Sequence, residues 1–360
     1  MKRKIVLFFN MVRPQKFLKI FSIIRKDGIA GVKYHFYLIK DRIKGLNKNC
    51  MKEYDISPVL EREFQEAGKW EYGILDFQEY KEPIVSIIIP VYNQFAYTYH
   101  CLEHIKRYET DIPYEIIVGD DCSTDRTTEL ERVAKGIKVI HNETNCQYLD
   151  NCNQMGREAR GKYLIFLNND TQVQKDWMES LVSLMEKDET IGLAGSKMIY
   201  PNGLAQEAGG IVWRDGSILQ FGNGRQPDEE ELNIQREVDY ISGASIIIRK
   251  ELWNDIGGFD RQFAPAYYED VDLAFQVRER GYKVVYQPES ELIHFAGLTE
   301  GVNEETRNLI ERNREKFYFK WEEILENQHY DFSEYARLVK KNPNFMCAGS
   351  SSMVWGEDES

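Results

Sequence analysis

Polar and acidic residues follow several apolar segments that are typical of β-strands. The run Asp-Asp-Cys-Ser-Thr-Asp starts at Asp120, an Asn-Asn-Asp triplet occupies 168–170, and His294 ends the last apolar segment. A further acidic group, Tyr-Tyr-Glu-Asp-Val-Asp-Leu, places Glu269 and Asp270 at the start of a predicted helix. Carboxylate oxygens suit hard divalent cations, and carboxylates often act as general bases. These residues are therefore candidates for cation binding and proton transfer.

The elements that would bring these residues together are strands and helices that alternate over residues 84–300. Such alternation predicts right-handed crossovers and a mostly parallel sheet. In these sheets ligands bind at the carboxyl ends of the strands, so the polar residues should meet at one rim. The predicted strands are Val85–Pro90, Glu115–Asp120, Lys138–His141, Tyr163–Leu167, Ile191–Ile199, Ile241–Ile248 and Val284–Gln287. The predicted helices are Tyr97–Tyr108, Thr127–Ala134, Asn151–Ala159, Trp177–Glu186 and Val271–Arg280.

An ordered set of motifs runs through this region. The motifs are P-V-Y-N (90–93), D-D-C-S-T-D, the N-N-D triplet, S-G-A (242–244), G-G-F-D (257–260), Y-Y-E-D-V-D-L and N-R-E-K-F-Y-F-K-W (313–321). Together they resemble the inverting glycosyltransferase family 2 over about residues 84–325, and the last is similar to the C-terminal helix of bacterial O-antigen and rhamnan-type members. The resemblance implies the GT-A fold, a Rossmann-like α/β arrangement in which helices flank a mostly parallel sheet.

The resemblance also implies a nucleotide-sugar donor, linked to UDP or dTDP. Asp121 would accept a hydrogen bond from a pyrimidine N3–H, and Asp120 would support the ribose side or the loop. Ser123 and Asp125 are more typical of a helix cap before Thr127. The implied nucleotide-sugar-binding residues are Pro90, Tyr92, Asn93, Asp120, Asp121, Asn168 and Asn169.

A divalent cation, Mn²⁺ or Mg²⁺, is implied at Asp170 and His294. Such a cation offsets the charge of the leaving nucleoside diphosphate. Here the first acid of the family's Asp-x-Asp is Asn168, whose carboxamide brings no charge. An ordinary turn at residues 168–170 and a purely structural His294 remain the alternative interpretations.

The Glu269–Asp270 pair carries the implied catalytic role. An inverting transfer is a single displacement, so a carboxylate opposite the diphosphate must take the proton of the acceptor hydroxyl. The resemblance assigns Asp270 as this base and Glu269 to the acceptor hydroxyls, while Asp272 would cap a helix starting at Val271. The Gly-rich residues 201–237 predict a loop or hairpin near the acceptor.

The first 52 residues differ from the rest in charge. They contain fourteen Lys and Arg residues and two acids, a net charge of +12, so the other 308 residues carry −25 of the total of −13. Their basic and apolar residues predict one or two amphipathic helices, broken near residues 28–31. Two interpretations are open, an interfacial anchor on anionic lipid and a helical hairpin docked on the main domain, and the one-sided charge favours the membrane. The net negative charge of residues 53–360 disfavours a nucleic-acid partner.

The remaining segments complete the predicted organisation. Residues 53–83 form a connector, 301–345 form C-terminal helices, and 346–360 form a disordered tail. We expect neither a secretory signal nor a membrane span. The six cysteines are scattered without Cys-x-x-Cys spacing, which is typical of reduced cytosolic thiols.

The resemblance, together with the basic segment, implies an enzyme that extends a cell-surface glycan, such as a lipid-linked O-antigen or capsule, from the cytoplasmic face of the plasma membrane. A non-catalytic nucleotide-sugar-binding scaffold remains an alternative, supported by Asn168. A sugar nucleotidyltransferase is disfavoured because the loop after the first strand, P-V-Y-N-Q-F, lacks glycine and basic residues. A dinucleotide-dependent oxidoreductase is disfavoured because no early strand is followed by G-x-G-x-x-G.

Overall fold

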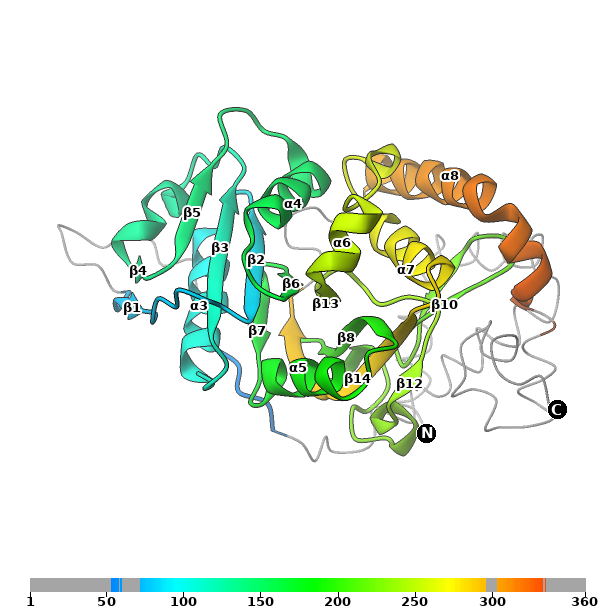
Figure 1. Cartoon of the computed structure of the whole chain (residues 1–360), viewed down its shortest axis with the longest axis horizontal. Coiled ribbons are helices and arrows are strands. Elements are labelled where there is room, and N and C mark those ends of the chain that lie inside the picture. The colour runs from blue at the N-terminus through cyan, green and yellow to red at the C-terminus, as the bar shows by residue number, and fades with distance from the viewer. Residues whose placement is uncertain (1–52, 58, 60–71, 296–302, 333, 335–360) are drawn as a thin grey trace, which may run out of the picture.

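The computed structural model describes residues 53–57, 59, 72–295, 303–332 and 334 (Figure 1). The predicted basic segment 1–52 and the tail 346–360 lie outside the described residues. Within this part of the chain, none of the helices combines the length and apolar composition needed to cross a bilayer.

A ten-stranded sheet forms the centre of the molecule. Eight of its strands lie in the order β12, β14, β8, β13, β6, β2, β3 and β5, while β7 pairs with β14 and β9 pairs with β8. The strands are β2 (Val85–Val91), β3 (Tyr114–Asp120), β5 (Lys138–His141), β6 (Tyr163–Leu167), β7 (Thr171–Val173), β8 (Ile191–Ile199), β9 (Ala205–Glu207), β12 (Arg236–Glu237), β13 (Ser245–Arg249) and β14 (Lys283–His294).

The sheet is mostly parallel, as predicted, but it is mixed. Strands β2, β3, β5, β6, β8 and β14 share one direction, whereas β7, β9, β12 and β13 run the opposite way. Strand β13 lies antiparallel between β6 and β8. The prediction of a strand from Ile241 was wrong for its first four residues, because Ile241–Ala244 precede β13 as a loop. Strand β14 continues beyond the predicted Gln287 to His294.

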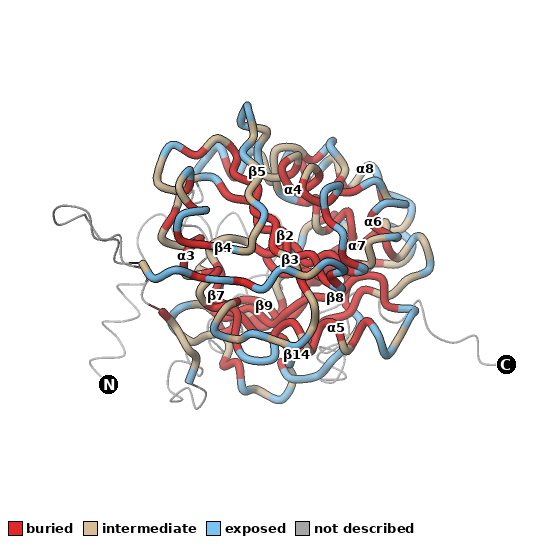
Figure 2. The backbone as a smooth tube through the Cα atoms, turned by 60° about the vertical axis from the view of Figure 1, so that its left-hand side comes forward, coloured by how far each residue is buried: buried red, intermediate tan, exposed pale blue. Residues whose placement is uncertain are grey.

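Helices cover both faces of this sheet (Figure 1). Side chains alternate across each strand, so Ile88 of β2 belongs to a buried cluster with residues of α4, α6, α7 and α8. Ile87 and Ile89 belong to a second buried cluster with residues of α3 and α5. Figure 2 shows the central strands as the most continuously buried part of the chain. The α-helices are α3 (Phe95–Arg107), α4 (Gln147–Glu158), α5 (Trp177–Lys187), α6 (Lys250–Ile256), α7 (Glu269–Glu279) and α8 (Glu304–Gln328). The 3₁₀-helices are η1 (Arg126–Arg132), η2 (Glu230–Asn233) and η3 (Arg261–Phe263).

Two small sheets complete the fold. β1 (Leu75–Asp76) pairs with β4 (Ala134–Lys135), and β10 (Gly210–Val212) pairs with β11 (Ile218–Gln220). The second pair is the hairpin predicted within residues 201–237. Trp213 at its turn packs edge-to-face on Phe332, with ring centroids 5.4 Å apart, and is therefore a packing residue.

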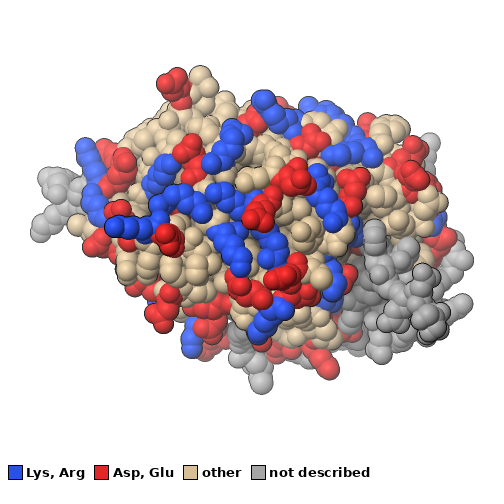
Figure 3. All heavy atoms as spheres, in the orientation of Figure 1, with Lys and Arg blue, Asp and Glu red and all other residues tan. Residues whose placement is uncertain are grey.

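Acidic and basic side chains alternate on the face shown in Figure 3. Among the described residues, ion pairs include Lys162–Glu186 and Arg160–Glu115, each at 2.7 Å between charged atoms. Exposed pairs of this kind each contribute little to stability, about 0–1 kcal/mol. Lys162 and Arg160 are therefore each balanced by a neighbouring acid.

Candidate active site

The carboxyl ends of β2, β3 and β6 border a pocket of about 680 Å³. The loop before β13, the start of α7, the hairpin strand β11 and helix α8 close its other sides. The structure therefore brings together most residues that the sequence singled out. The predicted site residues that line the pocket are Pro90, Tyr92, Asp121, Asn168, Asn169, Asp170, Glu269, Asp270 and His294.

Two predicted nucleotide-binding residues lie outside the pocket lining. Asn93 Oδ1 accepts the backbone N–H groups of Thr124 and Asp125, at 2.7 and 3.2 Å. The buried Asp120 accepts the N–H of Ser123 at 2.9 Å through one oxygen, and His141 Nδ1 lies 2.7 Å from the other. These contacts tie the loops after β2 and β3 to each other, so both residues support the shape of the rim.

The end of this loop caps a helix, as predicted. Asp125 Oδ1 accepts the N–H of Thr127 at 2.9 Å at the start of η1. Its Oδ2 accepts the N–H of Phe95 at 3.0 Å, which is the first residue of α3. The prediction of a regular helix here was only partly right, because η1 is a 3₁₀-helix that ends at Arg132.

The side chain of Asp121, which follows β3, lies at the N-terminal end of α4. Its carboxylate accepts the backbone N–H groups of Cys146 and Gln147 at 2.8 and 2.7 Å, and the amide of Asn142 at 2.9 Å. The Cys146 thiol is a fourth donor at 3.1 Å. A carboxylate offers about four acceptor positions, so a nucleotide N–H at Asp121 must displace or share one of these donors.

Helix α4 begins one turn earlier than predicted, at Gln147 rather than Asn151. The additional turn places Tyr148 in the pocket, a residue that the sequence analysis missed. Its hydroxyl donates to Asn168 Oδ1 at 3.3 Å and lies 3.5 Å from the Gly243 carbonyl. Tyr148 therefore connects the Asn-Asn-Asp triplet with the Ser-Gly-Ala loop.

Asp170 and His294 lie side by side. Strand β7 pairs with β14 so that Thr171 faces His294, and the backbone N–H of Phe295 donates to the Asp170 carbonyl at 3.0 Å. His294 Nε2 is 3.2 Å from Asp170 Oδ1, and its Nδ1 is buried without a hydrogen-bond partner among the described residues. Both side chains line the pocket.

This pair fits a cation that is also bound by a diphosphate. Magnesium sites with phosphate substrates commonly use one or two protein carboxylates, and the phosphate oxygens supply further ligands. Asp170 offers one carboxylate and His294 one imidazole nitrogen at the pocket wall. Within the described part of the chain, no group of three or more His, Cys, Asp or Glu side chains is arranged to hold a metal by itself.

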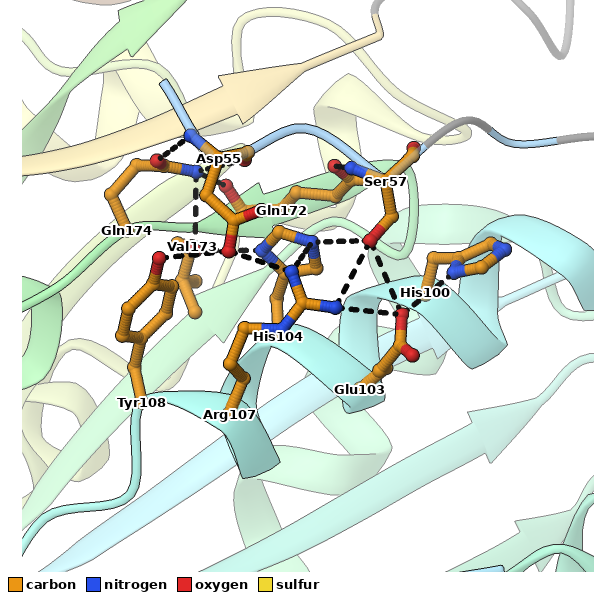
Figure 4. Close-up of polar contacts among 10 residues, drawn as sticks. All are labelled: Asp55, Ser57, His100, Glu103, His104, Arg107, Tyr108, Gln172, Val173 and Gln174. Atoms are coloured by element: carbon orange, nitrogen blue, oxygen red, sulfur yellow. Dashed lines mark hydrogen bonds and ion pairs between the residues drawn. The ribbon is translucent and has the colours of Figure 1, made fainter. Parts of the chain in front are cut away.

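A segment of the predicted connector is bound to Gln172, Gln174 and residues of α3 (Figure 4). Gln172 accepts the N–H of Ser57 at 2.9 Å and donates to its carbonyl at 2.8 Å. Gln174 makes the same pair of bonds to Asp55, at 3.0 and 2.9 Å, and Arg107 of α3 binds the Asp55 carboxylate. These contacts join β7, the strand that follows the triplet, to the connector and, through Asp55, to α3.

The acidic pair Glu269–Asp270 forms the first turn of α7. Tyr267 and Tyr268 before it have φ of 73° and 74°, a conformation that costs non-glycine residues about 1–3 kcal/mol each and is common at functional sites. Asn313 of α8 holds this segment, because its buried amide donates to the Tyr267 carbonyl at 2.9 Å and to two further carbonyls nearby. Asn313, the first residue of the last sequence motif, therefore supports the segment that leads into the acidic pair.

Asp270 and Glu269 differ in how their carboxyl groups are bonded. Asp270 accepts the N–H of Gly243 through Oδ2 and that of Val271 through Oδ1, both at 2.8 Å. Glu269 is buried, and its Oε2 has no hydrogen-bond partner among the described residues. Burial raises the pKa of both groups, and the charge of Asp270 raises the pKa of Glu269 further. A second negative charge beside Asp270 is therefore unfavourable in this buried site.

Asp272 does not cap α7, so that prediction was wrong. The helix begins at Glu269, which turns Asp272 inward to α8. Its carboxylate accepts Trp321 Nε1 at 2.8 Å and Lys320 Nζ at 2.9 Å. Asp272 therefore anchors the C-terminal helix.

The model of glycosyl transferase family 2 matches residues 86–257. The chain contains a family 2 glycosyltransferase domain. Its central sheet and flanking helices have the GT-A fold, which is also supported by likeness to a crystal structure of GalNAc-T7 with UDP, GalNAc and Mn²⁺. That likeness has a TM-score of 0.50 at 16% identity and covers 71% of this chain and 54% of the other.

Relatives by sequence come from several bacteria. An uncharacterized protein of Sinorhizobium fredii is 26% identical over 66% of this chain and 27% of its own length. The O-antigen biosynthesis protein RfbC of Myxococcus xanthus is 31% identical over 39% of this chain and 12% of its own length. An N-acetylglucosaminyl-diphospho-decaprenol L-rhamnosyltransferase of Mycobacterium tuberculosis is 24% identical over 59% of this chain and 78% of its own length. The chain thus matches only a minor part of the first two relatives.

Proposed function

We propose that this chain is an inverting glycosyltransferase that moves a sugar from a nucleotide-sugar donor to a hydroxyl group of a glycan acceptor. The observation that carries the proposal is a single pocket that contains Asp121, the Asp170–His294 pair and the Glu269–Asp270 pair. An inverting transfer needs a site for the nucleotide, charge compensation at the diphosphate and a base for the acceptor.

The donor side is the part of the pocket at the ends of β2, β3 and β6. Pro90, Tyr92 and Asp121 would contact the base and ribose, and Asn168 and Asn169 would contact the sugar nucleotide beyond them. A pyrimidine nucleotide, UDP or dTDP, would use its N3–H at Asp121. Asp170 and His294 would hold Mn²⁺ or Mg²⁺, which when bound supplies positive charge at the diphosphate.

Asp270 would act as the general base. Its raised pKa brings the carboxylate closer to the working pH, which makes proton transfer from a hydroxyl more favourable. The buried Glu269 Oε2, which lacks a partner within the described structure, would bind an acceptor hydroxyl. The proton thus moves from the acceptor oxygen to Asp270 while that oxygen forms the new bond to the anomeric carbon and the diphosphate leaves.

The acceptor side carries apolar residues. Ile218 of β11 and Leu309 and Ile310 of α8 line the pocket beside Tyr267. These residues, together with the names of the O-antigen and decaprenol-linked relatives, support a lipid-linked glycan as acceptor. Extension of an O-antigen or capsule at the cytoplasmic face of the membrane is the biological role that we propose.

The experiment that tests this function is a screen of activated sugars. Purified chain is incubated with UDP-, dTDP- and GDP-linked sugars, with and without Mn²⁺, and the released nucleoside diphosphate is measured. We expect release with a UDP- or dTDP-sugar, and faster release once a lipid-linked acceptor is added. Tight donor binding without release under any of these conditions would instead favour the non-catalytic scaffold.

The basic segment 1–52 is expected to bind anionic membranes. Each Lys or Arg near an anionic surface contributes about 1 kcal/mol, and salt screens this attraction. The full chain should therefore sediment with phosphatidylserine vesicles at low salt and much less at high salt, whereas a chain starting at residue 53 should stay in the supernatant. Neutral phosphatidylcholine vesicles are the control. Equal sedimentation of the full and shortened chains would contradict the membrane role.

A further inference from the structure

Glu207 is a buried acid that no motif identified. It ends the short strand β9, which pairs with β8, and its side chain is 0% exposed. Its Oε1 accepts the backbone N–H of Ser242 at 2.9 Å. Its Oε2 has no hydrogen-bond partner in the described part of the chain. A buried carboxyl oxygen without a hydrogen-bond partner is costly, so it calls for an explanation.

Glu207 and Asp270 hold neighbouring peptide groups of the same loop. Ser242 donates its N–H to Glu207, and the next residue, Gly243, donates its N–H to Asp270 Oδ2 at 2.8 Å. Both loop residues line the pocket. The approach at this point is close, because a Cβ added to Gly243 would lie 3.4 Å from the Asp270 Cβ. One hydrogen bond from Glu207 thus helps to hold the loop that donates to Asp270.

The surroundings of Glu207 favour its neutral form. Burial raises the pKa of Glu207 to about 8, and the charge of Asp270 acts in the same direction, while the Ser242 N–H and Gln220 oppose the rise. Tyr240 and Tyr286 are near enough that the charge of Glu207 contributes to the raised pKa of their phenol groups. Arg236 of β12 donates instead to the carbonyl of the following residue, Ala208. At neutral pH Glu207 therefore adds little negative charge beside Asp270.

We propose that Glu207 is a positioning residue for the transfer reaction, an uncharged acceptor that holds the Ser242–Gly243 loop so that Gly243 orients the Asp270 carboxylate. This inference rests on the proposed role of Asp270 as base. Glu207 acts through the loop and does not touch the substrate. A bond to the loop from a neutral group orients Asp270 without placing a second charge in the site.

Turnover in Glu207 variants tests the proposal. Glu207→Gln keeps a side-chain oxygen for the Ser242 N–H, so its kcat at pH 7 should stay within about threefold of wild type. Glu207→Ala removes that oxygen and should lower kcat by about 10- to 100-fold, since small misplacements of a catalytic group have effects of this size. The KM for the donor should change little in both variants. Gln206→Ala, which truncates the preceding buried side chain on the same strand, is the matched control and should keep the wild-type kcat.

A double variant separates this proposal from the proposed function. If Glu207 acts through Asp270, adding Glu207→Ala to Asp270→Asn should cost no further turnover, because the two residues act as one unit. A further loss of the full 10- to 100-fold in the double variant would overturn the positioning role. Wild-type turnover in Asp270→Asn alone would instead overturn the proposed function. A folded Glu207→Ala with wild-type kcat would overturn only the present inference.

The pH dependence of stability supplies a readout that does not need a substrate. An unfolded Glu207 ionises near pH 4.5, whereas the folded one has a pKa of about 8. Between these pH values Glu207 is protonated in the folded state and ionised in the unfolded state. The contribution of Glu207 to the free energy of unfolding therefore falls as pH rises, and it levels off above about pH 8. The Tm of Glu207→Gln minus that of wild type should therefore increase from pH 5 to pH 8. A Tm difference that stays constant between pH 5 and pH 8 would overturn the inference that Glu207 is uncharged in the folded protein.

Discussion

Replacing Asp270 with Asn is expected to lower turnover by at least about a hundredfold. An amide cannot take the proton of the acceptor hydroxyl, and loss of a general base usually costs about 10²–10⁴-fold in rate. The donor should still bind with near-normal affinity, because its proposed contacts come from the ends of β2, β3 and β6. Steady-state kinetics and calorimetric titration with the nucleoside diphosphate measure these two quantities.

The same substitution should have a modest cost in stability. Asp270 accepts two backbone N–H groups, from Gly243 and Val271, whereas the single oxygen of Asn can serve only one of them. An unsatisfied buried donor costs about 1–3 kcal/mol. Against this, a neutral side chain avoids the burial of charge that raises the pKa of Asp270. The melting transition should therefore remain cooperative, with a small decrease in Tm.

Two neighbouring acids provide the controls for Asp270. Glu269→Gln should raise the KM for the acceptor more than it lowers kcat. Asp272→Asn should lower Tm, because it weakens the bonds to Lys320 and Trp321, and should leave kcat unchanged. Wild-type turnover in Asp270→Asn would place the base elsewhere, with Glu269 as the next candidate. Loss of nucleotide binding would contradict the position of the acidic pair on the acceptor side.

Replacing Asp170 with Ala is expected to abolish metal-dependent transfer. Asp170 brings the only carboxylate of its triplet to the pocket, and a cation without it would be left with His294 and the diphosphate. His294→Ala should leave some activity and require more Mn²⁺ for half-maximal rate. Binding of Mn²⁺ in the presence of the nucleoside diphosphate, followed by electron paramagnetic resonance, measures the effect without turnover. Full activity of the wild type in excess EDTA would contradict the metal role of both residues.

Asn168 offers a gain-of-function control for the same site. The substitution Asn168→Asp restores the first acid of the Asp-x-Asp pattern. The new carboxylate keeps an oxygen that can accept the hydrogen bond from the Tyr148 hydroxyl. A second carboxylate should lower the Mn²⁺ concentration needed for half-maximal binding. Unchanged Mn²⁺ binding would indicate that residue 168 does not face the cation.

The sequence by itself determined the positions of the central strands. The predicted bounds of β5, β6 and β8 agree with the structure at both ends, and those of β2 and β3 differ by one residue. The reason is physical. Buried strands such as β2 and β6 need nearly continuous apolar runs, and these runs are visible in the sequence without knowledge of their partners. The motif order similarly indicated the fold, because P-V-Y-N, D-D-C-S-T-D and N-N-D lie at the ends of strands and Y-Y-E-D-V-D-L opens a helix.

The tertiary structure alone decided which residues meet and how they are bonded. Sequence patterns do not encode the direction of β13, the earlier start of α4 that brings in Tyr148, or the inward turn of Asp272 to α8. Glu207 carries no motif, and its link to Asp270 arises only because β9 and the loop before β13 lie side by side. Local propensity acts over a few residues, whereas these contacts join residues 20 or more positions apart, where packing and the need to satisfy buried polar groups decide the outcome.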